Sequence, residues 1–401
     1  MENEWQRGEA GLYLERGEAL EQAGRLDEAM GEYKRAVRAD PGLAEAHIAL
    51  GFHYRRKNLL SKAAEEFRTS ASLAPSYDSY FNLGHVLVDL GQPEEAIGAF
   101  RKCLALAPED PAVRYEIAYA YYTGGQYETA LGELRPLLDS YPGDWELHYL
   151  AGSAQLALGD YKAAEASFQH AQELLPPGEE GEGLADALQA ALRHQEFPAR
   201  EPWDIKARLY AEFGIVCLGA MGDDGLHIPV LPRDRLSYED LGRMLQRFHA
   251  LRLRWRWQFD VVVPVDEQSL PLAIAVAHSL RAPLAEVEDT PRAGLSLLVW
   301  SAVTVPELLT VTAERVAGRY VSFVASLAES DLDRVLPDII GVVGSSQMAL
   351  PWADAHDRHA VTAAARDIVS ALKSLPPDAT LVEQVRYYTQ AHRRLRFFPS
   401  V

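Results

Sequence analysis

Small polar and acidic side chains lie at the ends of three apolar segments in the second half of the chain, at 259–265, 295–301 and 338–343. Side chains in such turns can bind a phosphorylated sugar or a nucleotide, because hydroxyl groups and free backbone N–H groups hold anions. The five candidates for a ligand cleft are Asp266, Ser269, Ser301, Thr304 and Ser345. Binding of a phosphosugar or nucleotide is therefore one chemistry that this half of the chain could perform.

Several of these polar groups also have a structural explanation. Thr304 and Glu307 have the spacing of a helix capping box, and 344–346 (Gly-Ser-Ser) has the composition of an ordinary turn. Another group has the ligand types of a metal site: Asp354, His356, Asp357 and His359. Its spacing matches no dedicated metal site, and Asp357 is equally suited to cap a helix. We therefore predict no bound metal.

The elements that would position these residues alternate along the chain. Strands are predicted at 259–265, 295–301, 320–327 and 338–343, with a short extended segment at 283–288. Helices are predicted at 237–254, 270–280, 306–317, 358–375 and 381–395. This alternation is typical of a mostly parallel sheet covered on both faces, which binds ligands at the carboxyl ends of its strands. Before it, 213–220 and 226–231 flank the turn 222–225 (Gly-Asp-Asp-Gly), which predicts a hairpin.

Two strand ends resemble the type I phosphoribosyltransferase family. The segment 259–284, FDVVVPVDEQSLPLAIAVAHSLRAPL, resembles the strand, pyrophosphate loop and following helix of that family. The segment 297–308, LLVWSAVTVPEL, resembles the family signature, in which two acids and two apolar residues precede Thr-Thr-Gly. The resemblance covers about 213–345 and implies the fold of the family, with a cleft for phosphoribosyl pyrophosphate.

The residues that the resemblance would make functional are largely replaced. Trp300 and Ser301 stand where two acids of the family bind ribose hydroxyls. Val305 and Pro306 replace the second Thr and the Gly, and proline has no N–H to donate to a phosphate. The loop 266–269 adds two acids where a diphosphate would bind. We therefore predict a degenerate domain with no catalytic residues and no cofactor. The alternative is a nucleotide or phosphosugar sensor, or a related enzyme recruited by the first half.

The first half repeats about every 34 residues. Three kinds of position recur five times. They are a small residue (Gly17, Gly51, Gly84, Ala118 and Gly152), an alanine (Ala29, Ala63, Ala96, Ala130 and Ala164) and a proline (Pro41, Pro75, Pro108, Pro142 and Pro176). A bulky residue lies between the alanine and the proline each time: Tyr33, Phe67, Phe100, Leu134 and Phe168. The small residue would let a second helix approach the first closely.

This pattern resembles the tetratricopeptide repeat, a helix–turn–helix unit of about 34 residues. It implies five repeats over 10–178, stacked so that neighbours bury each other's apolar faces. The amphipathic segment 183–197 fits a capping helix. We thus predict an all-α solenoid at 1–198 and a phosphoribosyltransferase-like α/β domain at 199–401.

The first helices of the repeats carry aromatic side chains at a spacing that places them on one face. The predicted partner-binding groove contains Phe52, Arg55, Phe81, His85, Tyr115, Tyr119, Tyr122 and Tyr149. Tyrosine combines apolar area with a polar hydroxyl, which suits binding of a peptide or extended segment; alternatively, these rings only fill helix seams. Glu18 and Glu21 favour a basic ligand. Chaperone-binding members of the family hold a terminal carboxylate with Lys and Asn, where Leu14 and Glu18 stand here, so we expect no chaperone tail.

Composition narrows the class of partner. The net charge is −19, and 1–200 alone hold 33 acidic and 18 basic residues, a charge that repels nucleic acids and anionic membranes.

Two cysteines, Cys103 and Cys217, exclude a disulfide framework. No signal peptide or apolar run of 18 residues is evident. The 32 arginines and seven lysines are typical of a GC-rich prokaryote. We expect a cytoplasmic bacterial scaffold or adaptor; self-association stays open.

Overall fold

The computed structural model describes residues 2–178, 181, 183–197, 204–332, 334–353, 357–390 and 394–396, with side chains from residue 8 onward. The chain divides into two compact units, Met1–Ala191 and Leu192–Val401, and the division falls within helix α11 (Leu184–His194). None of the described helices combines the length and apolar character that crossing a membrane requires.

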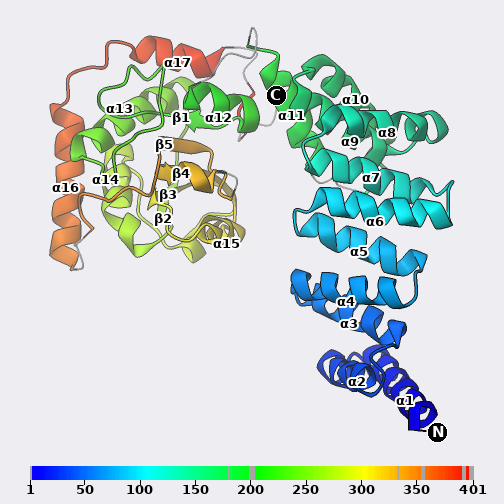
Figure 1. The fold of residues 1–401 in the computed structure, drawn as a ribbon. Helices are drawn as coiled ribbons and strands as arrows, with labels where there is room; N and C mark the ends of the chain where they lie inside the picture. Colours follow the sequence, from blue (N-terminus) through cyan, green and yellow to red (C-terminus); the bar gives the residue numbers. More distant parts are fainter. Residues whose placement is uncertain are drawn as a thin grey trace. The chain divides into compact units, whose positions relative to one another are not determined.

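The described part of the first unit is helical, and its helices pair in chain order (Figure 1). The first helices of the pairs, called A helices below, are α1 (Glu2–Gln22), α3 (Ala44–Arg56), α5 (Tyr77–Asp89), α7 (Pro111–Thr123) and α9 (Trp145–Leu158). The second helices, called B helices, are α2 (Leu26–Ala39), α4 (Leu60–Leu73), α6 (Pro93–Leu106), α8 (Tyr127–Ser140) and α10 (Tyr161–Leu174). The predicted helix–turn–helix repeats are confirmed.

A left-handed residue ends each A helix. Four of these residues are glycines with φ between 70° and 80°: Gly24, Gly91, Gly125 and Gly159. In the second repeat Asn58 takes the same place with φ of 55°, and asparagine is the residue that most readily replaces glycine there. The turn chemistry thus explains why the chain reverses at the same point in every repeat.

The small and bulky positions of each repeat face each other across the A and B helices. A Cβ atom added to Gly84 would lie 2.4 Å from the Phe100 ring, which is fully buried. Gly51 and Phe67 show the same relation, at 2.7 Å. In the fourth repeat the small residue is alanine, Ala118, and the bulky partner there is the smaller Leu134 instead of an aromatic ring. The size of one position therefore sets the size of the other.

The second unit contains a sheet whose described strands are all parallel. They are β1 (Val216–Cys217), β2 (Val261–Pro264), β3 (Leu295–Ala302), β4 (Arg319–Ala328) and β5 (Ile339–Gly344), in the order β1-β5-β4-β3-β2. Leu284 adds an isolated parallel bridge on the free side of β2. The chain therefore runs outward from β2 to Leu284 and then back to β3. The strand order reverses between β2 and β3, and the carboxyl ends of the strands at such a point are the usual ligand site of this architecture.

Helices cover both faces of this sheet. On one face, α13 (Tyr238–Trp255), α14 (Leu270–Leu280) and α16 (Arg358–Ser374) share a buried apolar cluster with side chains from β2 to β5. On the other face, α12 (Ile205–Phe213) and α15 (Glu307–Arg315) contribute to a second cluster. The predicted helices and strands agree with these elements within a few residues, except at the hairpin and the last helix.

The predicted hairpin is wrong. Within 213–220 only Val216–Cys217 forms a strand, and it pairs in parallel with β5. The segment 226–231 contributes a single parallel bridge, from Leu231 to Gly344. The intervening turn is held by an aspartate instead of by strand pairing: the Asp223 carboxylate accepts hydrogen bonds from the backbone N–H groups on both of its sides. The last helix is also shorter than predicted, since α17 spans Leu381–Thr389.

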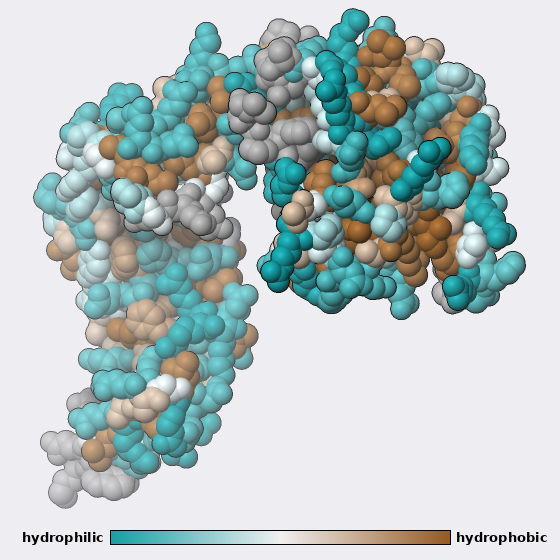
Figure 2. All heavy atoms as spheres, turned by 180° about the vertical axis from the view of Figure 1, so that it is seen from behind, coloured by the Kyte–Doolittle hydropathy of each residue, from teal (hydrophilic) through white to brown (hydrophobic). Residues whose placement is uncertain are grey.

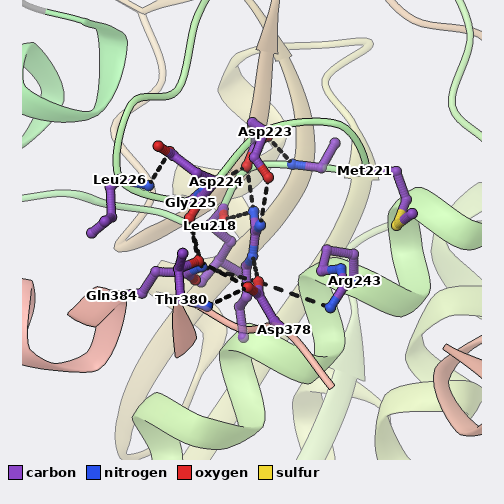
Figure 3. A network of polar contacts seen from close by, with 12 residues as sticks. Leu218, Met221, Asp223, Asp224, Gly225, Leu226, Arg243, Asp378, Thr380 and Gln384 are labelled. Carbon is purple, nitrogen blue, oxygen red and sulfur yellow. Dashed lines mark hydrogen bonds and ion pairs between the residues drawn. The ribbon is translucent and has the colours of Figure 1, made fainter. Parts of the chain in front are cut away.

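A buried arginine joins two peripheral segments of this unit to α13, and Figure 3 labels its partners Leu218, Asp223 and Asp378. Arg247 on α13 donates to the carbonyl oxygen of Leu218 at 2.8 Å, to Asp223 Oδ1 at 2.6 Å and to Asp378 Oδ2 at 2.8 Å. Burial raises the pKa of Asp378, but hydrogen bonds from Arg247 and neighbouring polar groups outweigh it and lower that pKa. The guanidinium thus connects the loop after β1 and the segment before α17 to the central helix.

Candidate functional site

The eight predicted groove residues lie on α3, α5, α7 and α9, and we call the surface formed by the A helices the A face. Side chains of successive A helices meet there: Arg55 Nε lies 3.6 Å from Asp89 Oδ2, and His85 Nδ1 lies 3.6 Å from Glu116 Oε2. Phe52 and Tyr119 are the most exposed of the eight, at 41% and 37%. The other six are half-buried: Arg55, Phe81, His85, Tyr115, Tyr122 and Tyr149.

The half-buried rings pack against the B helices and so partly fill helix seams. Phe81 lies edge-on to Phe100, with ring centroids 5.9 Å apart, and Tyr149 contacts Phe168 at 5.9 Å. Phe52 packs edge-on against Phe67 of α4, with ring centroids 5.3 Å apart, and Tyr119 stacks on its neighbour Tyr122, at 6.4 Å. The A face therefore consists of a packed aromatic layer from which two rings, those of Phe52 and Tyr119, extend toward solvent.

A cavity of about 700 Å³ lies at the start of the A face, between α1 and α3. Its lining residues are Glu18, Glu21, Tyr33, Glu45, Ile48, Ala49, Phe52, Arg55 and Arg56. Glu21 is neutralised by Arg56 at 2.6 Å and accepts a hydrogen bond from the Tyr33 hydroxyl at 2.7 Å. Glu18 and Glu45 are exposed and form no ion pair within the described part of the chain. The cavity thus combines an apolar floor with uncompensated negative charge.

Glu116 lies on the A face beside the predicted groove residues, and the sequence analysis missed it. It follows Tyr115 directly and so falls outside the helical spacing used to select the groove, yet it faces His85 on the neighbouring helix. Burial raises the pKa of Glu116 to about 7, although Arg55 acts to lower it. Burial also lowers the pKa of His85. The sequence did contain a signal for Glu116, because this glutamate lies between tyrosines in a helix predicted to be partly buried.

The substitution Glu116→Gln is expected to stabilise the first unit more at pH 8 than at pH 5. A carboxyl whose folded pKa is raised is stabilising below the unfolded value of about 4.3, and this contribution is lost as the pH rises through about 7. The neutral amide avoids that loss. Melting temperatures of variant and wild type, compared at both pH values, check this; a difference independent of pH would contradict the raised pKa.

At the ends of β2 and β3, the predicted cleft residues bond to each other. Asp266 Oδ2 accepts from the indole Nε1 of Trp300 at 2.8 Å, and Asp266 Oδ1 accepts from the backbone N–H and hydroxyl of Ser269. The Ser269 hydroxyl in turn accepts from the backbone N–H of Ser301 at 2.9 Å. Ser269 and Ser301 are fully buried. Three of the five cleft candidates thus belong to one internal network, Ser301 through its backbone N–H and not through its hydroxyl.

The remaining two candidates lie apart from this network. Thr304 is exposed and does not cap α15, which has Pro306 at its N-cap position and no capping side-chain bond, so the predicted capping box is wrong. Ser345 is exposed, but its backbone N–H donates to the carbonyl oxygen of Leu231 at 3.0 Å and is not free for a phosphate. The structure therefore brings together Asp266, Ser269 and Ser301, but not Thr304 or Ser345.

Two buried tryptophans lie at the end of the sheet where β2 and β3 finish. Trp300 is fully buried in the apolar cluster beneath α15. Trp352 donates from its indole to the carbonyl oxygen of Gln268 at 2.8 Å, and Gln347 donates to the carbonyl oxygen of Val303 at 3.1 Å. Side chains after β5 thus cover the loops that follow β2 and β3.

Of the metal-capable group, Asp354 and His356 lie outside the described residues. Asp357 caps α16, because its Oδ1 accepts from the backbone N–H of Ala360 at 2.8 Å. Among the residues that the structure describes, no three His, Cys, Asp or Glu side chains are grouped so as to hold a metal ion.

Comparison with known proteins assigns the first unit. Tetratricopeptide repeat family models match residues 10–53, 48–111, 87–141 and 115–179, so this part of the chain consists of tetratricopeptide repeats. No curated protein matches the chain.

Solved structures similar to part of the chain include YrrB, described as a TPR protein with an unusual peptide-binding site, at 22% identity and a TM-score of 0.40. That match covers 46% of this chain and 91% of YrrB. MamA is 24% identical with a TM-score of 0.39, covering 41% of this chain and 91% of MamA. MamA from Desulfovibrio magneticus RS-1 is 23% identical with a TM-score of 0.39, covering 41% and 94%.

Proposed function

We propose that the protein is a non-enzymatic scaffold or adaptor whose A face binds a peptide or extended segment of a protein partner. The observation that carries this proposal is the exposure of Phe52 and Tyr119 on a surface where the neighbouring rings are packed. Exposed aromatic side chains backed by buried ones are typical of residues that dominate binding energy, because the partner completes their burial without ordering new structure.

The charge of the A face favours a basic residue in that segment. Glu18 and Glu45 line the cavity next to Phe52 and have no ion-pair partner in the described part of the chain. A lysine or arginine can extend its alkyl part over Ile48 and place its charge near these carboxylates. The ligand we propose therefore has an apolar or aromatic residue beside a basic one.

A peptide selected on the full chain from a random dodecamer library tests the proposal. Phe52→Ala and Tyr119→Ala are each expected to weaken its binding at least tenfold, because each removes an aromatic contact worth about 1.4 kcal/mol or more. Leu73→Ala and Leu106→Ala are controls, since these leucines on B helices are at least as exposed as the two aromatic residues, at 43% and 55%. Affinity lost in the leucine variants but kept in the aromatic ones would place binding on the B helices instead.

For the second unit we propose a phosphoribosyltransferase-like arrangement that serves as a scaffold, without transferase activity. An internal network supports this, because the side chains of Asp266, Ser269 and Trp300 and the backbone N–H of Ser301 bond to one another and are not free for a diphosphate or ribose. Removing the network to admit a ligand would leave the half-buried Asp266 carboxylate without its donors, which is costly.

Titration of the full chain with phosphoribosyl pyrophosphate and magnesium is expected to give no binding heat and no change in melting temperature. A nucleotide panel should behave in the same way, because the groups at the strand ends bond to each other. Micromolar binding that disappears in Thr304→Ala or Ser345→Ala would contradict this expectation and favour the alternative function, a nucleotide or phosphosugar sensor.

A further inference from the structure

Hydrophobic patches interrupt the hydrophilic surface of the second unit (Figure 2). One apolar depression, with a volume of about 410 Å³, lies between α14 and α16. Its floor is formed by Ile274 and Ala275 of α14 and by Ala365 and Val369 of α16. Neither the phosphoribosyltransferase-like strand ends nor the A face includes any of these residues, so the groove has no part in the function proposed above.

The groove follows one stripe of α16 for about three turns. Its residues on this helix, from Thr362 to Lys373, recur at intervals of three and four and therefore lie on the same side. At 1.5 Å per residue the stripe is about 16 Å long. Alanines in the floor allow the backbone of another element to approach closely. A helix of about three turns, with large apolar side chains on one face, fits a groove of this form.

The ionisable residues that line the groove within the described part of the chain are all basic. His278, Arg366 and Lys373 line it, all three are exposed, and no acidic residue does. Arg366 and Lys373 form no ion pair with the described residues. Asp367, the acid on α16, lies toward α13, where it and burial raise the pKa of Tyr238. In a chain of net charge −19, cations left unpaired around an apolar floor define a preference for negative charge.

We propose that this groove docks an acidic amphipathic helix of a partner protein. The apolar residues of that helix cover Ile274 and Val369, and its flanking Asp or Glu side chains pair with Arg366 and Lys373. A two-fold dimer through the same groove is disfavoured, because it would bring the cations of one α16 close to those of the other.

A pair of synthetic peptides tests the proposal by fluorescence anisotropy with the full chain. Both are 16-residue amphipathic helices with leucines on one face; one carries Glu on its flanks and the other carries Lys at the same positions. The Glu peptide is expected to bind at least tenfold more tightly than the Lys peptide. The double substitution Arg366→Glu and Lys373→Glu should lower its affinity at least tenfold. Arg358→Glu, a single charge reversal at an exposed position of α16 outside the groove, should alter it less than twofold.

Two further variants and a stability measurement test whether the Glu peptide binds in this groove, and not on the A face, while the fold is kept. Tyr119→Ala should leave binding of the Glu peptide unchanged, and Val369→Asp, which adds an acid to the half-buried floor, should weaken it. The exposed positions of Arg366 and Lys373 mean that melting temperatures should stay within a few degrees of wild type. Equal binding of both peptides would overturn the proposal. The proposal would also be overturned if phosphatidylserine vesicles bound through Arg366 and Lys373 while the Glu peptide did not bind. A dimer of this chain that the double substitution dissociates would overturn it as well.

Discussion

Replacing Arg247 with methionine is expected to lower the free energy of unfolding of the second unit by about 3–5 kcal/mol, the cost of removing one partner from a buried ion pair. The guanidinium and both of its carboxylate partners are buried, with side-chain exposures of 3% for Arg247, 5% for Asp223 and 9% for Asp378. Without the arginine, Asp223 and Asp378 lose the cation that they share, and Asp378 keeps only the more distant Arg243, at 3.9 Å. The loop after β1 and the segment before α17 also lose the group that connects them.

Urea denaturation followed by tryptophan fluorescence measures this effect, since Trp255, Trp257 and Trp300 all lie in the second unit. Arg315→Met is the matched control: Arg315 pairs with Glu288 on the surface, where both side chains are more than half exposed, so the loss should stay below about 1 kcal/mol. If Arg247→Met and Arg315→Met had equal effects, the network around Arg247 would be of no more consequence than a surface ion pair.

Gly84→Ala is expected to destabilise the repeats by about 1–3 kcal/mol, although alanine is the better helix former. The added methyl group would lie 2.4 Å from the Phe100 ring, which is fully buried. The two helices of the third repeat must then separate or the ring must leave its position. Amide hydrogen exchange within α5 and α6 reports this loss locally.

The fourth repeat supplies the compensating change. Because Ala118 is accommodated there by Leu134, the double variant Gly84→Ala with Phe100→Leu should recover most of the stability that Gly84→Ala alone removes. Gly98→Ala is the control within the same repeat, since nothing lies within 4 Å of a Cβ atom at Gly98 and the change should be neutral or stabilising. A double variant less stable than either single one would contradict the pairing.

The features that could be predicted from the sequence are those that repeat along the chain or that depend on residues close together in the chain. The repeats were visible because every unit needs the same small residue, bulky residue and turn, and Asn58 shows how little the turn can vary. The helix that begins at Tyr238 was visible because Ser237 and Asp240 form both bonds of a capping box three residues apart. In each case the interacting residues are close in the chain.

The features that could not be predicted depend on partners far apart in the chain. From the sequence, Val216–Cys217 was predicted to lie in one strand of a hairpin. Its actual neighbour is the parallel strand β5, more than a hundred residues later in the chain. The cleft candidates were interpreted as ligand groups because they follow the ends of strands. The bond from the Trp300 indole N–H to Asp266, 34 residues earlier, is a property of the folded sheet. Glu116 was missed for the same reason, since its partner is on another helix.

The fit between small and bulky positions is made inside each repeat and not between repeats, as Gly84 with Phe100 and Gly51 with Phe67 show. A duplicated repeat therefore carries its own matched pair with it. Gene duplication or deletion can lengthen or shorten this array by whole units without a second, compensating mutation, and each added unit extends the A face by one more helix. The ligand length that the protein accommodates can thus change in evolution by discrete steps, independently of the sheet that follows the repeats in the chain.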